Sequence, residues 1–319
     1  MKAVAIIQAR MGSSRLPGKV LLDIAGKPML VHVIERVLCA STLDHSGTPV
    51  IVATTTDSGD DPIEAECQKR GYPVYRGSVH DVLDRYYQAA RTVVSPGEGH
   101  MIVRITGDCP TIEPELIDLA VQAVRASSPG FDFACTRLPP PWHRTFPIGL
   151  DVEVCTFNAL ERAWQNSSQT YHREHVMPYL YEECRSVHYG IILGRKSPME
   201  IPSGKQHTIL QELRPLPTSP PSEPDPFRVL VFDHQPDYGN HRWTVDTPED
   251  LEAIRKIFNQ FSGRSDRMNC IRFHWYEVID LIQRVPELAY LNTDGKAKDY
   301  REFDRRQSGQ RSSPGQGQP

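Results

Sequence analysis

Short apolar runs alternate with helical periods along the first ~127 residues of the chain. Buried strands are predicted by the apolar runs at 3–7, 49–54 and 101–106, of which the first two are rich in β-branched residues. A shorter strand is predicted at 74–75. Each run precedes a segment in which apolar residues recur three and four positions apart, which is typical of a helix. Four strand-then-helix units predict an α/β fold, with a Rossmann-like, mostly parallel sheet and helices on both faces.

The later pattern is less regular and mixes strands with helices. Pro28, Ser78 and Thr247 stand where helices are expected to begin, with Ser78 and Thr247 as N-caps and Pro28 as the first helical residue. The other predicted elements are, in chain order, strands at 131–135 and 147–154, helices at 157–165 and at 167–183 with a kink or break at Pro178, a strand at 229–232, and a last helix at 276–284.

One stretch departs from any periodic pattern. Residues 196–226 contain eight prolines and few apolar residues, which is typical of an insertion or linker. We therefore expect an α/β core at 1–195, a Pro-rich insertion at 196–226, and the C-terminal part of the same domain with terminal helices at 227–300. The polar segment 301–319, rich in Gly, Ser, Gln and Pro, predicts a disordered tail.

The loop after the first strand carries the clearest candidate chemistry. Gly12 and Gly18 allow backbone N–H groups to approach a ligand closely, and Arg10, Arg15 and Lys19 add three cations. One phosphate does not need three cations, whereas a triphosphate does. The loop is not a P-loop, because five residues separate Gly12 from Gly18-Lys19 and Val20 follows.

Acidic residues mark three further places. Asp108 follows a predicted central strand, where a half-buried carboxylate needs a cation. Asp246 lies at a predicted strand end, just before the helix that Thr247 caps. Asp151 and Glu153 occupy alternate positions of a predicted strand, so they are expected to share one face and to serve as metal or hydroxyl ligands. Cys109 has no base beside it in sequence and is expected to be a packed residue.

Residues 8–22, together with 26–30, resemble the signature of nucleotidyltransferases that activate sugars and sugar acids. The closest resemblance is to the cytidylyltransferases that make CMP-linked sialic acids and CMP-linked octulosonate, and to their SpsF-like spore-coat-polysaccharide branch. It covers roughly residues 2–195 and 228–262 and leaves the Pro-rich segment outside. The resemblance implies the architecture of nucleotide-diphospho-sugar (GT-A-like) transferases, CTP as donor, a sugar or sugar acid as acceptor, and Mg²⁺ as cofactor.

The resemblance also implies residue roles. Asp108 and Asp246 match the family's magnesium ligands, and Lys19, Arg15 and Asp108 are the expected catalytic residues. The expected nucleotide-binding residues are Ala9, Arg10, Gly12, Ser13, Arg15, Lys19, Gly77 and Ser78. The expected sugar-binding residues are Asp151, Glu153 and Arg173. Arg137, Arg144 and Arg173 are equally able to bind an acceptor carboxylate, and the sequence does not choose between them.

Composition bears on the protein's partners and location, and two alternative functions stay open. A net charge of −4 gives no general attraction to nucleic acid or anionic membrane, and no apolar run approaches a membrane span. Seven scattered cysteines and an N-terminus that runs straight into a strand predict a cytoplasmic protein without a signal peptide. A homodimer is a further possibility, which the sequence does not decide. The alternatives are a sugar-1-phosphate nucleotidyltransferase using GTP, UTP or dTTP, and a non-catalytic nucleotide-binding homologue.

Overall fold

The computed structural model describes residues 2–94, 99–126, 130–140, 142–193, 209–212, 225–264 and 270–290. Its strands are β1 (Lys2–Gln8), β2 (Asp23–Ile24), β3 (Lys27–Pro28), β4 (Val50–Thr55), β5 (Val74–Gly77), β6 (His100–Thr106), β7 (Phe133–Cys135), β8 (Glu153–Thr156), β9 (Cys184–Leu193), β10 (Ile209–Glu212) and β11 (Phe227–Gln235). Its helices are η1 (Lys19–Leu21), α1 (Met29–Val37), η2 (Ser58–Asp60), α2 (Asp61–Arg70), α3 (Val82–Arg91), α4 (Pro114–Ala126), α5 (Phe157–Asn166), α6 (Thr170–His175), α7 (Pro178–Glu182), α8 (Pro248–Phe261), α9 (Trp275–Arg284) and α10 (Glu287–Tyr290).

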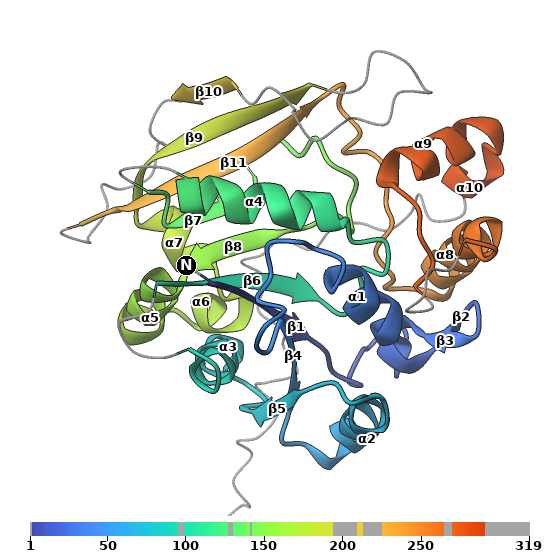
Figure 1. Ribbon diagram of the computed structural model, residues 1–319, viewed down its shortest axis with the longest axis horizontal. Helices are drawn as coiled ribbons and strands as arrows, with labels where there is room; N and C mark the ends of the chain where they lie inside the picture. The colour runs from blue at the N-terminus through green and yellow to red at the C-terminus, as the bar shows by residue number, and fades with distance from the viewer. Residues whose placement is uncertain are drawn as a thin grey trace, which may run out of the picture.

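Nine of these strands form one mixed sheet in the order β10-β9-β11-β7-β8-β6-β1-β4-β5 (Figure 1). β6, β1, β4 and β5 are parallel to one another, as the four strand-then-helix units predict. β8 runs antiparallel to both β6 and β7. The start of β8 therefore lies at the same edge as the carboxyl ends of β6 and β7, and this edge carries the candidate site.

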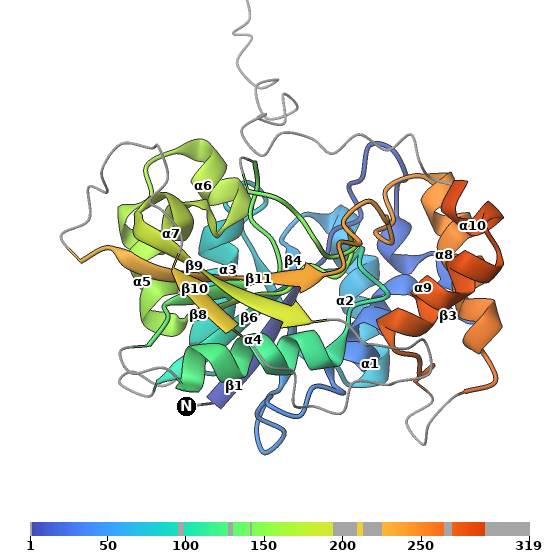
Figure 2. The same cartoon turned by 90° about the horizontal axis from the view of Figure 1, so that it is seen from above.

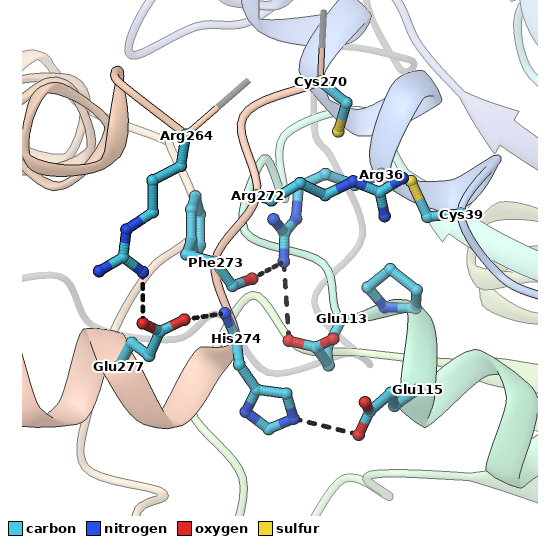
Figure 3. A pocket seen from close by; sticks show the side chains of 11 residues that line it. Arg36, Cys39, Glu113, Glu115, Arg264, Cys270, Arg272, Phe273, His274 and Glu277 are labelled. Carbon is cyan, nitrogen blue, oxygen red and sulfur yellow. Dashed lines mark hydrogen bonds and ion pairs between the residues drawn. The ribbon is translucent and has the colours of Figure 1, made fainter. Parts of the chain in front are cut away.

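The C-terminal helices pack at the end of the molecule where α1 lies (Figures 1 and 2). Arg36 of α1 joins them to the core: its Nε donates to the carbonyl of Ile112 at 2.7 Å, and its Nη2 donates to the carbonyl of Phe273 at 3.1 Å. It also lies 3.6 Å from the carboxylate of Glu113. Arg36, Glu113 and Phe273 line a cavity of about 410 Å³ (Figure 3). In the same cavity Arg264 pairs with Glu277, and His274 pairs with Glu115.

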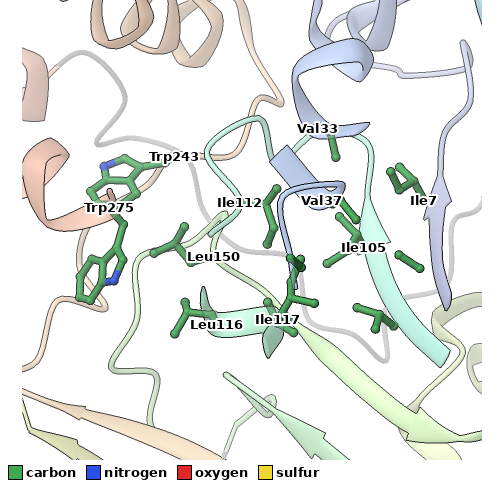
Figure 4. Close-up of a cluster of buried hydrophobic side chains, with 14 of the residues drawn as sticks. Ile7, Val33, Val37, Ile105, Ile112, Leu116, Ile117, Leu150, Trp243 and Trp275 are labelled. Atoms are coloured by element: carbon green, nitrogen blue, oxygen red, sulfur yellow. The ribbon is translucent and has the colours of Figure 1, made fainter. Parts of the chain in front are cut away.

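Two hydrophobic layers lie on opposite faces of the sheet, because alternate residues of each strand point to opposite sides. Ile7 and Ile105 join one layer with α1, α4 and α8, whereas Ile6 and Ile102 join the other with α3 and α5. Figure 4 shows the first layer between α1 and the two tryptophans of the C-terminal part. The predicted fold class is thus confirmed, with helices on both faces of a mostly parallel sheet.

Several local expectations are wrong. α1 begins at Met29, with Pro28 as the residue before it. The N-cap of α3 is Asp81, whose carboxylate accepts from the amide of Asp84 at 2.8 Å, while Ser78 Oγ accepts from the amide of Asp81 at 3.0 Å. The strand expected at 147–154 begins only at Glu153, so Asp151 precedes it.

The Pro-rich stretch lies mostly outside the described residues, as does the tail at 301–319. Within the stretch, β10 pairs antiparallel with β9, so part of the expected linker is a strand of the main sheet. The break expected at Pro178 is present, because α6 ends at His175 and α7 begins at Pro178. Between them Val176 has a φ of 73°, a backbone conformation that β-branched residues rarely adopt.

Candidate active site

The loop after β1 is folded so that Lys19 turns back into the protein. Gly18 has a φ of 70°, which glycine adopts without strain, and its amide donates to the carbonyl of Met11 at 2.9 Å. The amide of Met11 in turn donates to Asp60 at 2.7 Å. Asp60 is buried and also accepts from the Thr54 hydroxyl at 3.0 Å, so the loop is anchored on the neighbouring strand β4.

The ammonium of Lys19 joins the two acids that were expected to hold a metal. Its Nζ lies 2.7 Å from Asp108 Oδ2 and 2.9 Å from Asp246 Oδ1, and it donates to the carbonyl of Val245 at 2.7 Å. An ammonium has three N–H donors, so all three are used. The fold therefore brings three residues that are far apart in the sequence to one cation position.

A second layer of charges fixes Asp246. Arg15 Nη2 lies 3.0 Å and Arg242 Nη2 lies 2.6 Å from Asp246 Oδ2. Arg242 Nε also pairs with Asp250 at 3.1 Å, and Asp250 accepts from the amides of Asp246 and Thr247 in the capping box of α8. Asp246 lies in an irregular segment between an isolated bridge at Arg242 and α8, so its expected place at a strand end is wrong.

The neighbouring charges shift the pKa values of Lys19 and Asp246. Burial by itself lowers the pKa of Lys19, but the carboxylates of Asp108 and Asp246 outweigh it and raise that pKa overall. Burial raises the pKa of Asp246, and the cations Lys19, Arg15 and Arg242 outweigh it and lower that pKa. Lys19 is therefore an ammonium and Asp246 a carboxylate at neutral pH.

The donor set fits a magnesium ion that shares its coordination with a nucleotide. Among the described residues there is no group of three or more His, Cys, Asp or Glu side chains that could hold a metal. Mg²⁺ commonly takes one or two carboxylates and completes its shell with water and substrate phosphates. Asp108 and Asp246, which already face one cation, provide such a pair.

The remaining nucleotide-site candidates lie around this loop. Arg10 and Gly12 are exposed, Ser13 is half-buried, and Ala9 is buried. Gly77 ends β5, two strands away, and Ser78 follows it; the carbonyl of Gly77 accepts from the amide of Thr56 at 3.0 Å. Their contacts with a nucleotide stay predictions. Cys109 is buried, and desolvation raises the pKa of its thiol, which agrees with a packing role.

Of the two expected sugar-site acids, Glu153 begins β8 and Asp151 lies just before that strand. Asp151 accepts from Arg144 Nη1 at 2.5 Å and from Nη2 at 3.3 Å, while Glu153 pairs with Arg104 across β8 and β6. Because β8 runs antiparallel to β6, both acids lie toward the edge of the sheet where β6 ends. Their direct contact with sugar hydroxyls stays a prediction.

Arg173 occupies a different setting. Its Nε donates to Asp81 at 2.8 Å, and its Nη1 donates to the carbonyl of Trp164 at 2.6 Å. Asp81 is the N-cap of α3, so Arg173 ties α6 to α3 and α5. Its role in sugar binding stays a prediction, but its described hydrogen bonds are structural.

Sequence reasoning missed three residues that hold the site together, namely Asp60, Arg242 and Asp250. The position of Asp60 before Pro62 is typical of a helix start, and nothing local shows that its carboxylate holds the first loop. Asp250 stands three residues after Thr247, a spacing that indicates a capping box. No local signal shows that Asp250 also binds Arg242.

Gly149 sets the distance between the two segments beside Asp108. Its φ is 111°, and a Cβ at this position would lie 2.7 Å from the carbonyl carbon of Trp243 and 2.8 Å from the amide of Thr244. We expect Gly149→Ala to displace the segment that leads to Asp246, lowering both the melting temperature and any nucleotide-dependent activity. Differential scanning calorimetry would measure the first effect. Gly263→Ala is the matched control, because a Cβ there meets open space and Gly263 lies outside the proposed nucleotide site. An unchanged melting temperature of Gly149→Ala would contradict this view.

A family model described as cytidylyltransferase matches residues 4–216. The chain belongs to the cytidylyltransferase family. The chain is 38% identical to the 3-deoxy-manno-octulosonate cytidylyltransferase of Yersinia enterocolitica, over 81% of this chain and 98% of that protein. It is 29% identical to the spore coat polysaccharide biosynthesis protein SpsF of Bacillus subtilis, over 89% of this chain and 95% of that protein.

A solved structure agrees with this membership. The structure of a cytidylyltransferase from Leptospira borgpetersenii superposes on this cytidylyltransferase-family protein with a TM-score of 0.68 at 27% identity. The match covers 93% of this chain and 99% of that one. Both the sheet and the C-terminal helices are therefore part of the shared architecture. In the part of the chain that the structure describes, no helix is long and apolar enough to cross a membrane.

Proposed function

We propose that this cytidylyltransferase-family protein transfers CMP from CTP to a sugar acid and releases pyrophosphate. The observation that carries the proposal is the convergence of Asp108 and Asp246 on the single ammonium of Lys19. Family membership supports a nucleotidyl transfer, and the likeness to an octulosonate cytidylyltransferase supports a sugar acid as acceptor. The likeness to SpsF supports a product used in surface polysaccharide or glycan biosynthesis.

In the proposed reaction an acceptor oxygen forms a bond to the α-phosphorus of CTP, and the bond from that phosphorus to pyrophosphate breaks. The protein must align the two reactants and stabilise the negative charge that spreads over the phosphates. Asp108 and Asp246 would hold Mg²⁺. When bound, the ion supplies charge neutralisation at the α-phosphate and lowers the pKa of a hydroxyl that it contacts.

The cations of the first loop act on the leaving group. Arg10 and Arg15 are exposed at the mouth of the site, where they are able to contact the β- and γ-phosphates. Lys19 has no N–H left over in the ligand-free arrangement. We infer that it exchanges a carboxylate contact for a phosphate contact when the nucleotide and its metal enter together.

The proposal predicts a specific pattern of ligand-induced stabilisation. We expect CTP with Mg²⁺ to raise the melting temperature more than UTP, GTP, ATP or dTTP do, and Mg²⁺ alone to have little effect, since Lys19 already fills the cation position. A ligand present at 100 times its Kd adds about 2.7 kcal/mol, which a thermal shift assay detects readily.

The same assay separates the alternatives. Preference for UTP, GTP or dTTP would favour a sugar 1-phosphate as acceptor. Stabilisation by CTP without pyrophosphate release in the presence of sugar acids would favour a non-catalytic homologue. Absence of any response to nucleotides would refute the proposal.

A further inference from the structure

Three arginines and two acids gather at the edge of the sheet beside the reaction site, and we call them the arginine cluster. They are Arg104, Arg137, Arg144, Asp151 and Glu153. Arg104 pairs with Glu153, and Arg144 binds Asp151 through both of its Nη atoms. Arg137 is left with one longer contact, 3.6 Å from its Nε to Asp151 Oδ2. Three guanidinium groups face two carboxylates, so the cluster carries one uncompensated positive charge.

Arg137 is also the most accessible of the three arginines. Its side chain is 37% exposed, against 13% for Arg104 and 18% for Arg144. Its Nε atom is buried without a hydrogen-bond partner. A guanidinium has five N–H donors in a planar fork, and among the described residues Arg137 has only the contact with Asp151 to engage them. The excess charge therefore sits on a side chain that is able to meet a ligand.

The arginine cluster is continuous with the proposed catalytic centre. Arg137 follows β7 and Asp108 follows β6, and both strands end where the antiparallel β8 begins. The segment before Asp151 is tied to the segment before Asp246, since the amide of Trp243 donates to the carbonyl of Ile148 at 2.6 Å. The amide of Val245 then donates to the carbonyl of Asp108 at 2.9 Å.

The catalytic centre itself has no such excess. Lys19, Arg15 and Arg242 there balance Asp108, Asp246 and Asp250. Of the three arginines that the sequence left as candidates for an acceptor carboxylate, two are committed elsewhere. Arg144 is paired with Asp151, and Arg173 is paired with Asp81 and donates to the carbonyl of Trp164.

We propose that Arg137 binds the carboxylate of the acceptor and so selects sugar acids over neutral sugars. This inference rests on the proposed function, whose acceptor it identifies by charge. A carboxylate carries one negative charge and matches the fork of one guanidinium, and its binding leaves the arginine cluster neutral. A phosphate monoester carries between one and a half and two negative charges at neutral pH, which one uncompensated arginine does not balance.

The test compares an acid with its uncharged amide. Binding of 3-deoxy-manno-octulosonate, of N-acetylneuraminate and of their carboxamides is measured by calorimetry, with a non-hydrolysable CTP analogue and Mg²⁺ present. We expect the natural chain to bind at least one acid about 10- to 100-fold more tightly than its carboxamide, as charge-assisted hydrogen bonds provide. Arg137→Gln should bind the acid and the carboxamide equally. Arg70→Gln removes an exposed positive charge on α2 and should behave like the natural chain.

The outcomes separate this inference from the proposed function. Absence of an acid preference in the natural chain, or its persistence in Arg137→Gln, overturns the inference. Arg137-dependent binding of glucose 1-phosphate in place of the acids also overturns it. An Arg137-dependent acid preference in a protein that releases no pyrophosphate supports the inference and refutes the transferase proposal, because binding is measured without turnover.

Discussion

Replacing Asp108 with asparagine is expected to lower kcat/KM for cytidylyl transfer by about 10³-fold while the protein stays folded. The substitution keeps the shape of the side chain but removes one of the two carboxylates that would hold Mg²⁺. Lys19 keeps its contacts with Asp246 and with the carbonyl of Val245, so no buried charge loses every partner. Asp246→Asn should lose activity to a similar extent. Pyrophosphate release from CTP and a sugar acid is the measurement.

Glu66→Gln is the matched control for both substitutions. It removes one carboxylate from α2, where Glu66 pairs only with Arg70 in the described structure, and should leave kcat/KM unchanged. Circular dichroism and the melting temperature should show that all three variants fold. Near-full activity of Asp108→Asn or Asp246→Asn would show that the metal is held elsewhere.

The largest expected effect on stability comes from Arg36. Its guanidinium is buried against Glu113, which is also buried, and it stacks 4.1 Å from the ring centre of Phe273. Arg36→Met would leave the Glu113 carboxylate without the Arg36 cation, and it would leave three backbone carbonyls, those of Ile112, Ile271 and Phe273, without this donor. Breaking a buried pair by removing one partner costs about 3–5 kcal/mol. We therefore expect the free energy of unfolding, measured in urea, to fall by about this amount.

The pH dependence of the loss distinguishes charge from packing. Burial raises the pKa of Glu113 above its usual range, and Arg36 and His274 only partly offset this. Without Arg36 that pKa rises further, so Glu113 is protonated in the folded variant at moderately acidic pH and no longer needs a cation. The difference in unfolding free energy between the natural chain and Arg36→Met should thus shrink as the pH falls from neutral toward the ordinary pKa of a glutamate.

Two comparisons make this expectation falsifiable. Arg70→Met breaks an exposed pair and should cost about 1 kcal/mol or less. Arg36→Met combined with Glu113→Gln removes both charges and should recover part of the stability. A pH-independent loss, or no recovery in the double variant, would mean that lost packing against Phe273 dominates.

The sequence predicts the strand-then-helix part of the fold well, because hydrophobic period and helix-start residues are local signals. The N-cap at Thr247 appears where it is expected. Period alone does not show strand direction, so the antiparallel β8 was not predictable. Its late start at Glu153 is the reason that Asp151 lies outside the strand.

In the candidate site, too, single residues could be identified from the sequence, but the contacts between them could not. Asp108 and Lys19 follow strand ends, and Asp246 precedes a strong helix start, so each could be identified singly. Their shared contact could not be identified, since it joins residues more than 200 positions apart in the sequence. The same holds for Asp60 beneath the first loop and for the excess charge at Arg137, which depends on how Arg104 and Arg144 are paired.

The position of Lys19 between two carboxylates has a consequence for how the protein is made. Small metalloproteins whose ligands repel one another in the absence of the ion depend on that ion to fold. Here Lys19 bridges both acids and Arg15 and Arg242 also pair with Asp246, so the fold does not need the ion to hold the two carboxylates together. Newly synthesised chains can complete their fold before they meet a divalent cation. Protein kept in a chelator should melt at the same temperature as protein kept in Mg²⁺ without nucleotide. It should regain full turnover as soon as Mg²⁺ and nucleotide are supplied.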